Sequence, residues 1–164
     1  MKPIFQFSIV LLFSSVLLGG CKSNSTSPNS SGTNNIPSGM TATINGKAWK
    51  SEAVVGFLHA APLNNVQFEG WVNTPFQQMP FGVSTSITGP GTYALIQNDQ
   101  TTGNIVQVSY NTDASSYSDN VTGSITITIL TNSNIQGTFN FSAIGAPYGD
   151  TVIVTNGQFN VPLH

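Results

Sequence analysis

Hydrophobic and polar residues alternate along most of the chain from residue 40 onward. Alternation with period two is typical of a β-strand that buries one face and exposes the other. It is clearest at residues 66–72, 81–87, 125–129 and 135–143, and weaker at 53–60, 92–96 and 105–110. Residues rich in Asn, Gly and Pro separate these runs, as turns require. We predict an all-β fold, either an antiparallel β-sandwich or a partly open barrel, of about nine to ten short strands.

The alternation also predicts which side chains face the core. In the run at 66–72, Gln67, Glu69 and Trp71 face outward, opposite the apolar residues between them. In the run at 125–129, all three isoleucines face inward, and in the run at 135–143 the odd-numbered residues do so.

Asn45-Gly46 lies between two alternating runs and predicts a two-residue β-hairpin turn, since both residues accept the positive φ of a type I′ turn. This turn places Ala42 opposite Trp49 and Ile44 opposite Lys47. Ala42, Ile44 and Trp49 then share one face.

Asn156-Gly157 predicts a second hairpin of the same kind. A two-residue loop there pairs Val154 with Phe159 and Val152 with Val161. All four apolar side chains then lie on one face, as a half-buried hairpin requires.

Residues 1–20 are predicted to be a secretory signal peptide, because Lys2 precedes an apolar stretch that is too short to span a membrane. The stretch ends in Leu18-Gly19-Gly20-Cys21, which resembles the lipobox of bacterial lipoproteins. The resemblance implies cleavage between Gly20 and Cys21 and transfer of a lipid to the Cys21 thiol. Lipidated Cys21 would then anchor the chain to a membrane. The alternative is an ordinary secreted protein with an accidental cysteine.

Residues 21–39 are rich in Ser, Asn, Thr, Gly and Pro. Such a segment buries too little apolar surface to offset the entropy of ordering it, so we predict a flexible tether. Its reach is on the order of 25 Å. The folded β-domain is expected to cover residues 40–164.

Charge is scarce, at 6% charged residues and a formal net charge of −2 over 164 residues. The basic residues are Lys2, Lys22, Lys47 and Lys50. No basic patch can form that would hold a phosphate backbone, which argues against nucleic-acid binding. Cys21 is the single cysteine, so the chain has neither an internal disulfide nor a Cys/His zinc motif. We predict no cofactor and no metal centre.

Other candidates for chemistry are weak. His59 could serve a hydrolase, but no G-x-S-x-G motif accompanies it, and we predict no catalytic residue. His164 is the last residue and is expected to be frayed. Asp113 and Asp119, in a predicted loop at 111–120, are weak candidates for calcium ligands because their spacing does not fit an EF-hand.

A ligand site is predicted on the outward face of the run at 66–72. Trp71 lies there beside Gln67 and Glu69, and Phe76 follows in a Pro-flanked loop. Exposed aromatic rings beside amide groups bind glycans or peptides by stacking and hydrogen bonding. The alternative is that a loop or a second sheet covers Trp71.

The segments GSITI at 123–127, IQGTFNF at 135–141, NGQFNV at 156–161 and TINGKAW at 43–49 carry a family resemblance. Together with the lipobox they resemble small lipoproteins of the Bacteroidota type that carry a β-rich domain of unknown function. The resemblance implies a lipid-anchored domain in the cell envelope, on the outer membrane and facing the periplasm or the outside. It assigns no catalytic residue. We expect a function in binding or surface display. The alternatives are a carbohydrate- or peptide-binding module of a nutrient-uptake system and, remotely, a small hydrolase.

Lipidation at Cys21 can be tested by metabolic labelling of the full chain with a fatty acid in a bacterial host. The parent chain should take up the label, and Cys21→Ala should take up none because the acceptor thiol is gone. Ser23→Ala, two residues away, should label like the parent. Equal labelling of the parent and Cys21→Ala would contradict the lipobox.

Overall fold

The computed structural model describes residues 37–164, apart from 60–64, 85–86 and 97–105. The predicted signal peptide, the cleavage site at Gly20 and Cys21, and almost all of the tether lie outside these residues. So do residues 60, 85, 86 and 105, which belong to three predicted strands. The regular elements of the described part are all strands, and within it no helix is long and apolar enough to cross a membrane.

Eleven strands form in the described residues, which confirms the all-β prediction. They are β1 (Gly39–Ile44), β2 (Lys47–Lys50), β3 (Ala53–His59), β4 (Asn65–Asn73), β5 (Phe76–Val83), β6 (Gly91–Ile96), β7 (Val106–Val108), β8 (Tyr110–Thr112), β9 (Ser116–Leu130), β10 (Asn134–Ala146) and β11 (Thr151–Pro162). Hydrogen bonds join them into one sheet in the order β2-β1-β11-β10-β9-β6-β7-β5-β4-β3, and β8 pairs with β5 and β9. Every pair is antiparallel except β6 with β7, which makes the sheet mixed.

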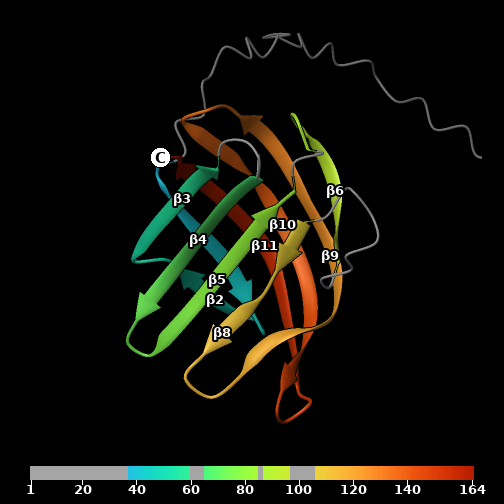
Figure 1. Cartoon of the computed structure of the whole chain (residues 1–164). Coiled ribbons are helices and arrows are strands. Elements are labelled where there is room, and N and C mark those ends of the chain that lie inside the picture. The colour runs from blue at the N-terminus through green and yellow to red at the C-terminus, as the bar shows by residue number, and fades with distance from the viewer. Residues whose placement is uncertain (1–36, 60–64, 85–86, 97–105) are drawn as a thin grey trace, which may run out of the picture. The chain divides into compact units, whose positions relative to one another are not determined.

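The sheet bends back on itself, so that β3, β4 and β5 lie in front of β1 and β11 (Figure 1). Two glycines allow this close approach. A Cβ on Gly56 of β3 would lie 2.7 Å from Leu163 Cδ2, and a Cβ on Gly70 of β4 would lie 2.9 Å from Met40 Sδ. The fold is therefore sandwich-like, but one continuous sheet forms both layers.

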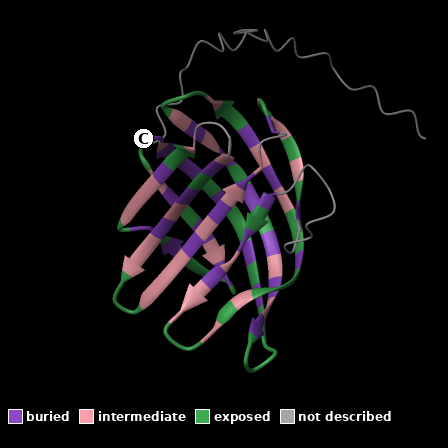
Figure 2. Ribbon diagram, in the orientation of Figure 1, coloured by how far each residue is buried: buried purple, intermediate pink, exposed green. Residues whose placement is uncertain are grey.

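The core between the layers contains four packed phenylalanine rings. Phe68 of β4 stacks on Phe81 of β5 and on Phe159 of β11, with ring centroids 4.9 Å apart in both pairs. Phe139 of β10 meets Phe81 edge-on at 5.0 Å. Along β4, β5 and β10, buried residues alternate with half-buried or exposed ones (Figure 2). The predicted inward faces of residues 66–72 and 135–143 are confirmed.

The end of the chain is held in place, so the predicted fraying of His164 is wrong. The His164 N–H donates to Gly56 O, and the His164 carbonyl accepts from the Leu58 N–H, both at 3.1 Å. Leu163 is buried beside this junction. Backbone hydrogen bonds therefore attach the residues after β11 to the outer edge of β3.

The hairpin predicted at Asn45-Gly46 is confirmed. Asn45 has φ 47° and Gly46 has φ 79°, as a type I′ turn requires. Ala42 pairs with Trp49, and Ile44 pairs with Lys47, in the predicted register.

The hairpin predicted at Asn156-Gly157 is wrong, because both residues lie within the continuous strand β11. From Thr41 to Thr43, β1 advances two residues while its partner β11 advances three, from Gln158 to Thr155. The pairing of β10 with β11 shows the same difference, so β11 carries a bulge there. Asn156 has a positive φ, of 53°, and Gly157 does not. Val154 pairs with Phe141 and Ile44, and Phe159 pairs with Gly137 and Met40. The extra residue still keeps Val154 and Phe159 on the buried face.

A second bulge turns Ile129 outward, contrary to the predicted inward face of all three isoleucines. Ile125 and Ile127 are buried, whereas Ile129 is 40% exposed. Gln136 of β10 pairs with Ile129 of β9, and the next residue, Gly137, pairs with Ile127. β9 therefore advances two residues where β10 advances one. The alternation therefore changes parity at this point.

Gly157 is required by packing. A Cβ there would lie 2.5 Å from two carbons of the buried Phe139 ring. Gly157→Ala should lower the free energy of unfolding by about 1–3 kcal/mol, as overpacked cores do. Gly82→Ala is the matched control, since a Cβ at Gly82 meets nothing within 4 Å. It should be neutral or stabilising by up to about 1 kcal/mol. Equal midpoints in urea unfolding for the two variants would contradict this packing.

Candidate functional site

The outward face of β3, β4 and β5 presents two rows of side chains that the strand register aligns. Phe57, Gln67, Gly82 and Gln107 form the first row across β3, β4, β5 and β7. Val55, Glu69 and Pro80 form the second row. These rows point away from the core because the residues between them, such as Phe68 and Phe81, fill it.

A cavity of about 550 Å³ lies over these two rows, and we call it the outer groove. Ser118 and Asp119 of β9 also line it. Gly82 deepens it, since a side chain at this position would extend into open space. The volume falls within the range of about 300–1,000 Å³ that is typical of small-molecule sites.

The outer groove combines polar and apolar surface and carries negative charge. Glu69 and Asp119 supply two carboxylates. The Glu69 Oε2 atom accepts a hydrogen bond from Gln78 Nε2 at 2.8 Å, which fixes its orientation. Lys47 and Lys50, the lysines of the described residues, lie on β2 and do not line the groove. The arrangement suits hydrogen bonding to a neutral polar molecule better than binding to an anion.

Of the four residues predicted to bind a ligand, the structure brings Gln67 and Glu69 together in the groove. Trp71 lies in the next row of the same face, between Ala53 and Gln78, where it is half-buried. Phe76 is half-buried at the start of β5 and pairs with Asn73. Neither Trp71 nor Phe76 lines the groove.

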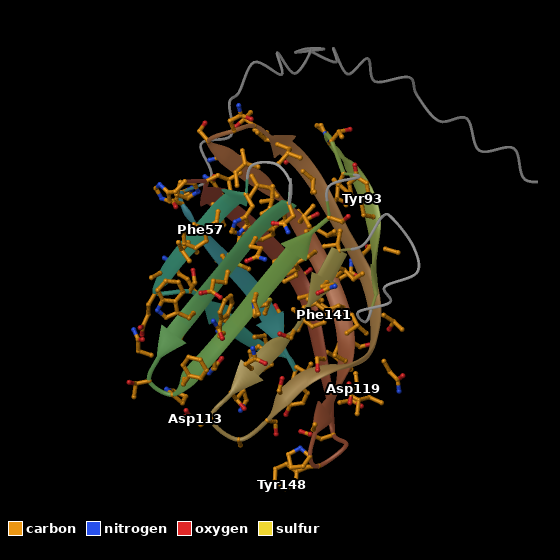
Figure 3. All side chains as sticks on the ribbon, viewed as in Figure 1. Phe57, Tyr93, Asp113, Asp119, Phe141 and Tyr148 are labelled. Atoms are coloured by element: carbon orange, nitrogen blue, oxygen red, sulfur yellow. The ribbon has the colours of Figure 1, made fainter. Side chains whose placement is uncertain are left out.

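The exposed aromatic residue that lines the groove is Phe57, which the alternation along the chain did not single out; Phe68 and Phe81 also line it but are buried. Phe57 lies on β3, is 46% exposed, and pairs with Gln67 in the register (Figure 3). Residues 53–59, AVVGFLH, show no clear alternation, so the side on which Phe57 lies was not evident. Gly56 was the available signal, because a glycine inside a strand often marks a close backbone contact on its own face.

The predicted loop at 111–120 is mostly strand, since β9 begins at Ser116. Asp113 is exposed in the turn between β8 and β9, whereas Asp119 lies on β9 and lines the groove. Figure 3 shows the two carboxylates on different parts of the β8–β9 hairpin. No group of three His, Cys, Asp or Glu side chains suited to a metal occurs within the described residues. His59 is on β3, where its ring centroid lies 6.3 Å from that of Phe57.

Two tyrosines connect β8 and β9 beside the groove. Tyr117 donates its hydroxyl to Asp150 Oδ2 at 2.6 Å, and this hydrogen bond raises the pKa of Tyr117 above its ordinary value. Tyr110, whose ring centroid is 5.7 Å from that of Tyr117, donates to Gln77 Oε1 at 2.9 Å. Burial, with a smaller effect of the Tyr117 charge, raises the pKa of Tyr110 to about 12.

The fold and the groove together define a small all-β domain with one hollowed, amide-lined face. The chain belongs to the family described as Domain of unknown function (DUF6252), whose model matches residues 37–162. The match confirms the domain of unknown function that the resemblance implied, and the lipid anchor stays a prediction. Neither the curated proteins nor the solved structures contain a match to this chain.

The raised pKa of Tyr110 predicts a loss of stability in alkali. The unfolded chain releases this proton near pH 10, whereas the folded protein keeps it up to about pH 12. In this window the unfolded state binds fewer protons, so the free energy of unfolding falls as the pH rises. We expect a fall on the order of 1–2 kcal/mol. Urea unfolding at a series of pH values should show a shallower fall for Tyr110→Phe. Equal slopes for parent and variant would contradict the assignment.

Proposed function

We propose that this protein is a lipid-anchored binding domain of the cell envelope that holds a glycan or peptide ligand in the outer groove. The observation that carries the proposal is the meeting of an exposed aromatic ring, Phe57, with Gln67 and Glu69 around one cavity. A concave site that combines apolar surface with a few placed polar groups is the usual form of a ligand pocket.

Binding explains why the polar groups occupy this face. Gln67 is exposed and presents an amide that can both donate and accept a hydrogen bond. The Glu69 carboxylate is held by Gln78 and accepts only, so its preference is for a hydroxyl or amide donor. A ligand with both kinds of group can satisfy the two side chains together.

The proposed lipid anchor would hold this binding site near a membrane. Lipid on Cys21 and a tether with a reach on the order of 25 Å would place the domain close to an outer-membrane surface, on the periplasmic or the external side. From there it could pass a captured ligand to a nutrient-uptake system. Surface display without a ligand is the competing function.

The binding proposal can be tested by probing glycan and peptide arrays with the full chain. Gln67→Ala should weaken binding to any ligand found by about five- to tenfold, which corresponds to the loss of one hydrogen bond. Gln158→Ala, a change of another exposed glutamine on β11, should bind like the parent. Thermal unfolding should show that both variants remain folded. Absence of binding on both arrays, or equal binding by all three chains, would contradict the proposal.

A further inference from the structure

Phe57 is the one exposed phenylalanine among the described residues. It is 46% exposed, although burial of a phenylalanine side chain stabilises a folded protein. Polar side chains lie close to it in the groove, with Gln67 directly opposite on β4 and Glu69 two residues further along that strand. A ring in this setting offers a flat apolar surface bordered by hydrogen-bonding groups.

Gly82 leaves room for a ligand beside this ring. It follows Gln67 in the same cross-strand row, and a Cβ there would touch nothing within 4 Å. Its backbone has an ordinary negative φ, so no turn requires glycine. The missing side chain therefore enlarges the groove without serving the fold.

The backbone beneath the groove is already paired. β4 is bonded to β3 and β5, and β5 is bonded to β4, β7 and β8. At the outer edge of β3, Gly56 O and Leu58 N–H are bonded to His164. An extended peptide that binds by strand addition needs unpaired backbone groups at a sheet edge, whereas the groove lies over the face of strands that are already paired. We therefore expect recognition in the groove to use side chains.

We propose that Phe57 is the platform on which a pyranose ring of a neutral glycan stacks, with Gln67 and Glu69 hydrogen-bonding to its hydroxyls. The proposal rests on the binding function proposed above and commits that site to carbohydrate. A sugar ring presents apolar C–H groups on its face and hydroxyls around its rim, which matches the aromatic and polar surfaces of the groove. The carboxylates of Glu69 and Asp119, with no lysine in the lining, disfavour acidic sugars.

The test measures binding of the full chain to neutral cello-, xylo-, malto- and manno-oligosaccharides and to acidic oligogalacturonate by isothermal titration. At least one neutral series should bind, and oligogalacturonate should not. Phe57→Ala should weaken binding by about tenfold or more, and Phe57→Tyr, which keeps the ring, should stay within about threefold of the parent. Ile153→Ala is the matched control, because Ile153 is similarly exposed but lies on β11.

A second variant tests whether the ligand occupies the space beside the Phe57 ring. Gly82→Thr should keep the urea midpoint of the parent, since a β-branched residue suits a strand and meets no neighbour, but should weaken binding by about tenfold by filling the groove. If Gln67→Ala weakens binding but Phe57→Ala and Gly82→Thr do not, the stacking proposal is wrong and the binding site stands. Binding of peptides without binding of any neutral glycan leads to the same conclusion. Absence of any binding overturns both proposals.

Discussion

The stacking of Phe68 on Phe159 is the contact on which the architecture depends. Phe68 belongs to β4 and Phe159 to β11, and five strands separate them in the order of the sheet. Their rings nevertheless lie 4.9 Å apart in the core. Gly56 of β3 and Gly70 of β4 allow the opposite layer to approach closely. Together with the contact between the two rings, they let one long sheet fold into two packed layers. The ring contact also directs the site, because Phe68 pointing inward forces Gln67 and Glu69 outward into the groove.

Periodicity predicted most of the strands but could not tell a hairpin from a bulge. A two-residue loop at Asn156-Gly157 and one extra residue within β11 both place Val154 and Phe159 on the same face. The distinction comes from β1 and β10, which pair with opposite edges of β11 before and after this stretch, so that the strand continues through it. At Asn45-Gly46, β11 pairs with only one side of β1, and the chain turns so that β2 pairs with the other side. Ile129 was misplaced for the same reason, since a bulge is decided by the partner strand.

The sequence predicted the polar residues of the candidate site but not its exposed aromatic residue. Gln67 and Glu69 follow from the alternation of β4, which is regular because one face of that strand is buried against the core. Phe57 could not be assigned, because both sides of β3 carry apolar residues. The reason is the close contact of Gly56 with Leu163, which lets the chain end fill the inner side while larger side chains remain outside. A contact between residues so far apart in sequence leaves no local pattern.

The pairing of β1 with β11 has a consequence for how the chain folds. The backbone of Ile153 bonds to the side chain of Asn45 across 108 residues of sequence. Closing a loop of that length costs conformational entropy before any contact is gained, and folds dominated by such contacts form slowly. The local hairpins β1–β2, β3–β4–β5 and β9–β10 can form early, but the β1–β2 hairpin cannot join the rest of the sheet until β11 is present. During synthesis from the N-terminus, the β1–β2 hairpin therefore lacks its partner strand β11 until residues 151–162 have been added.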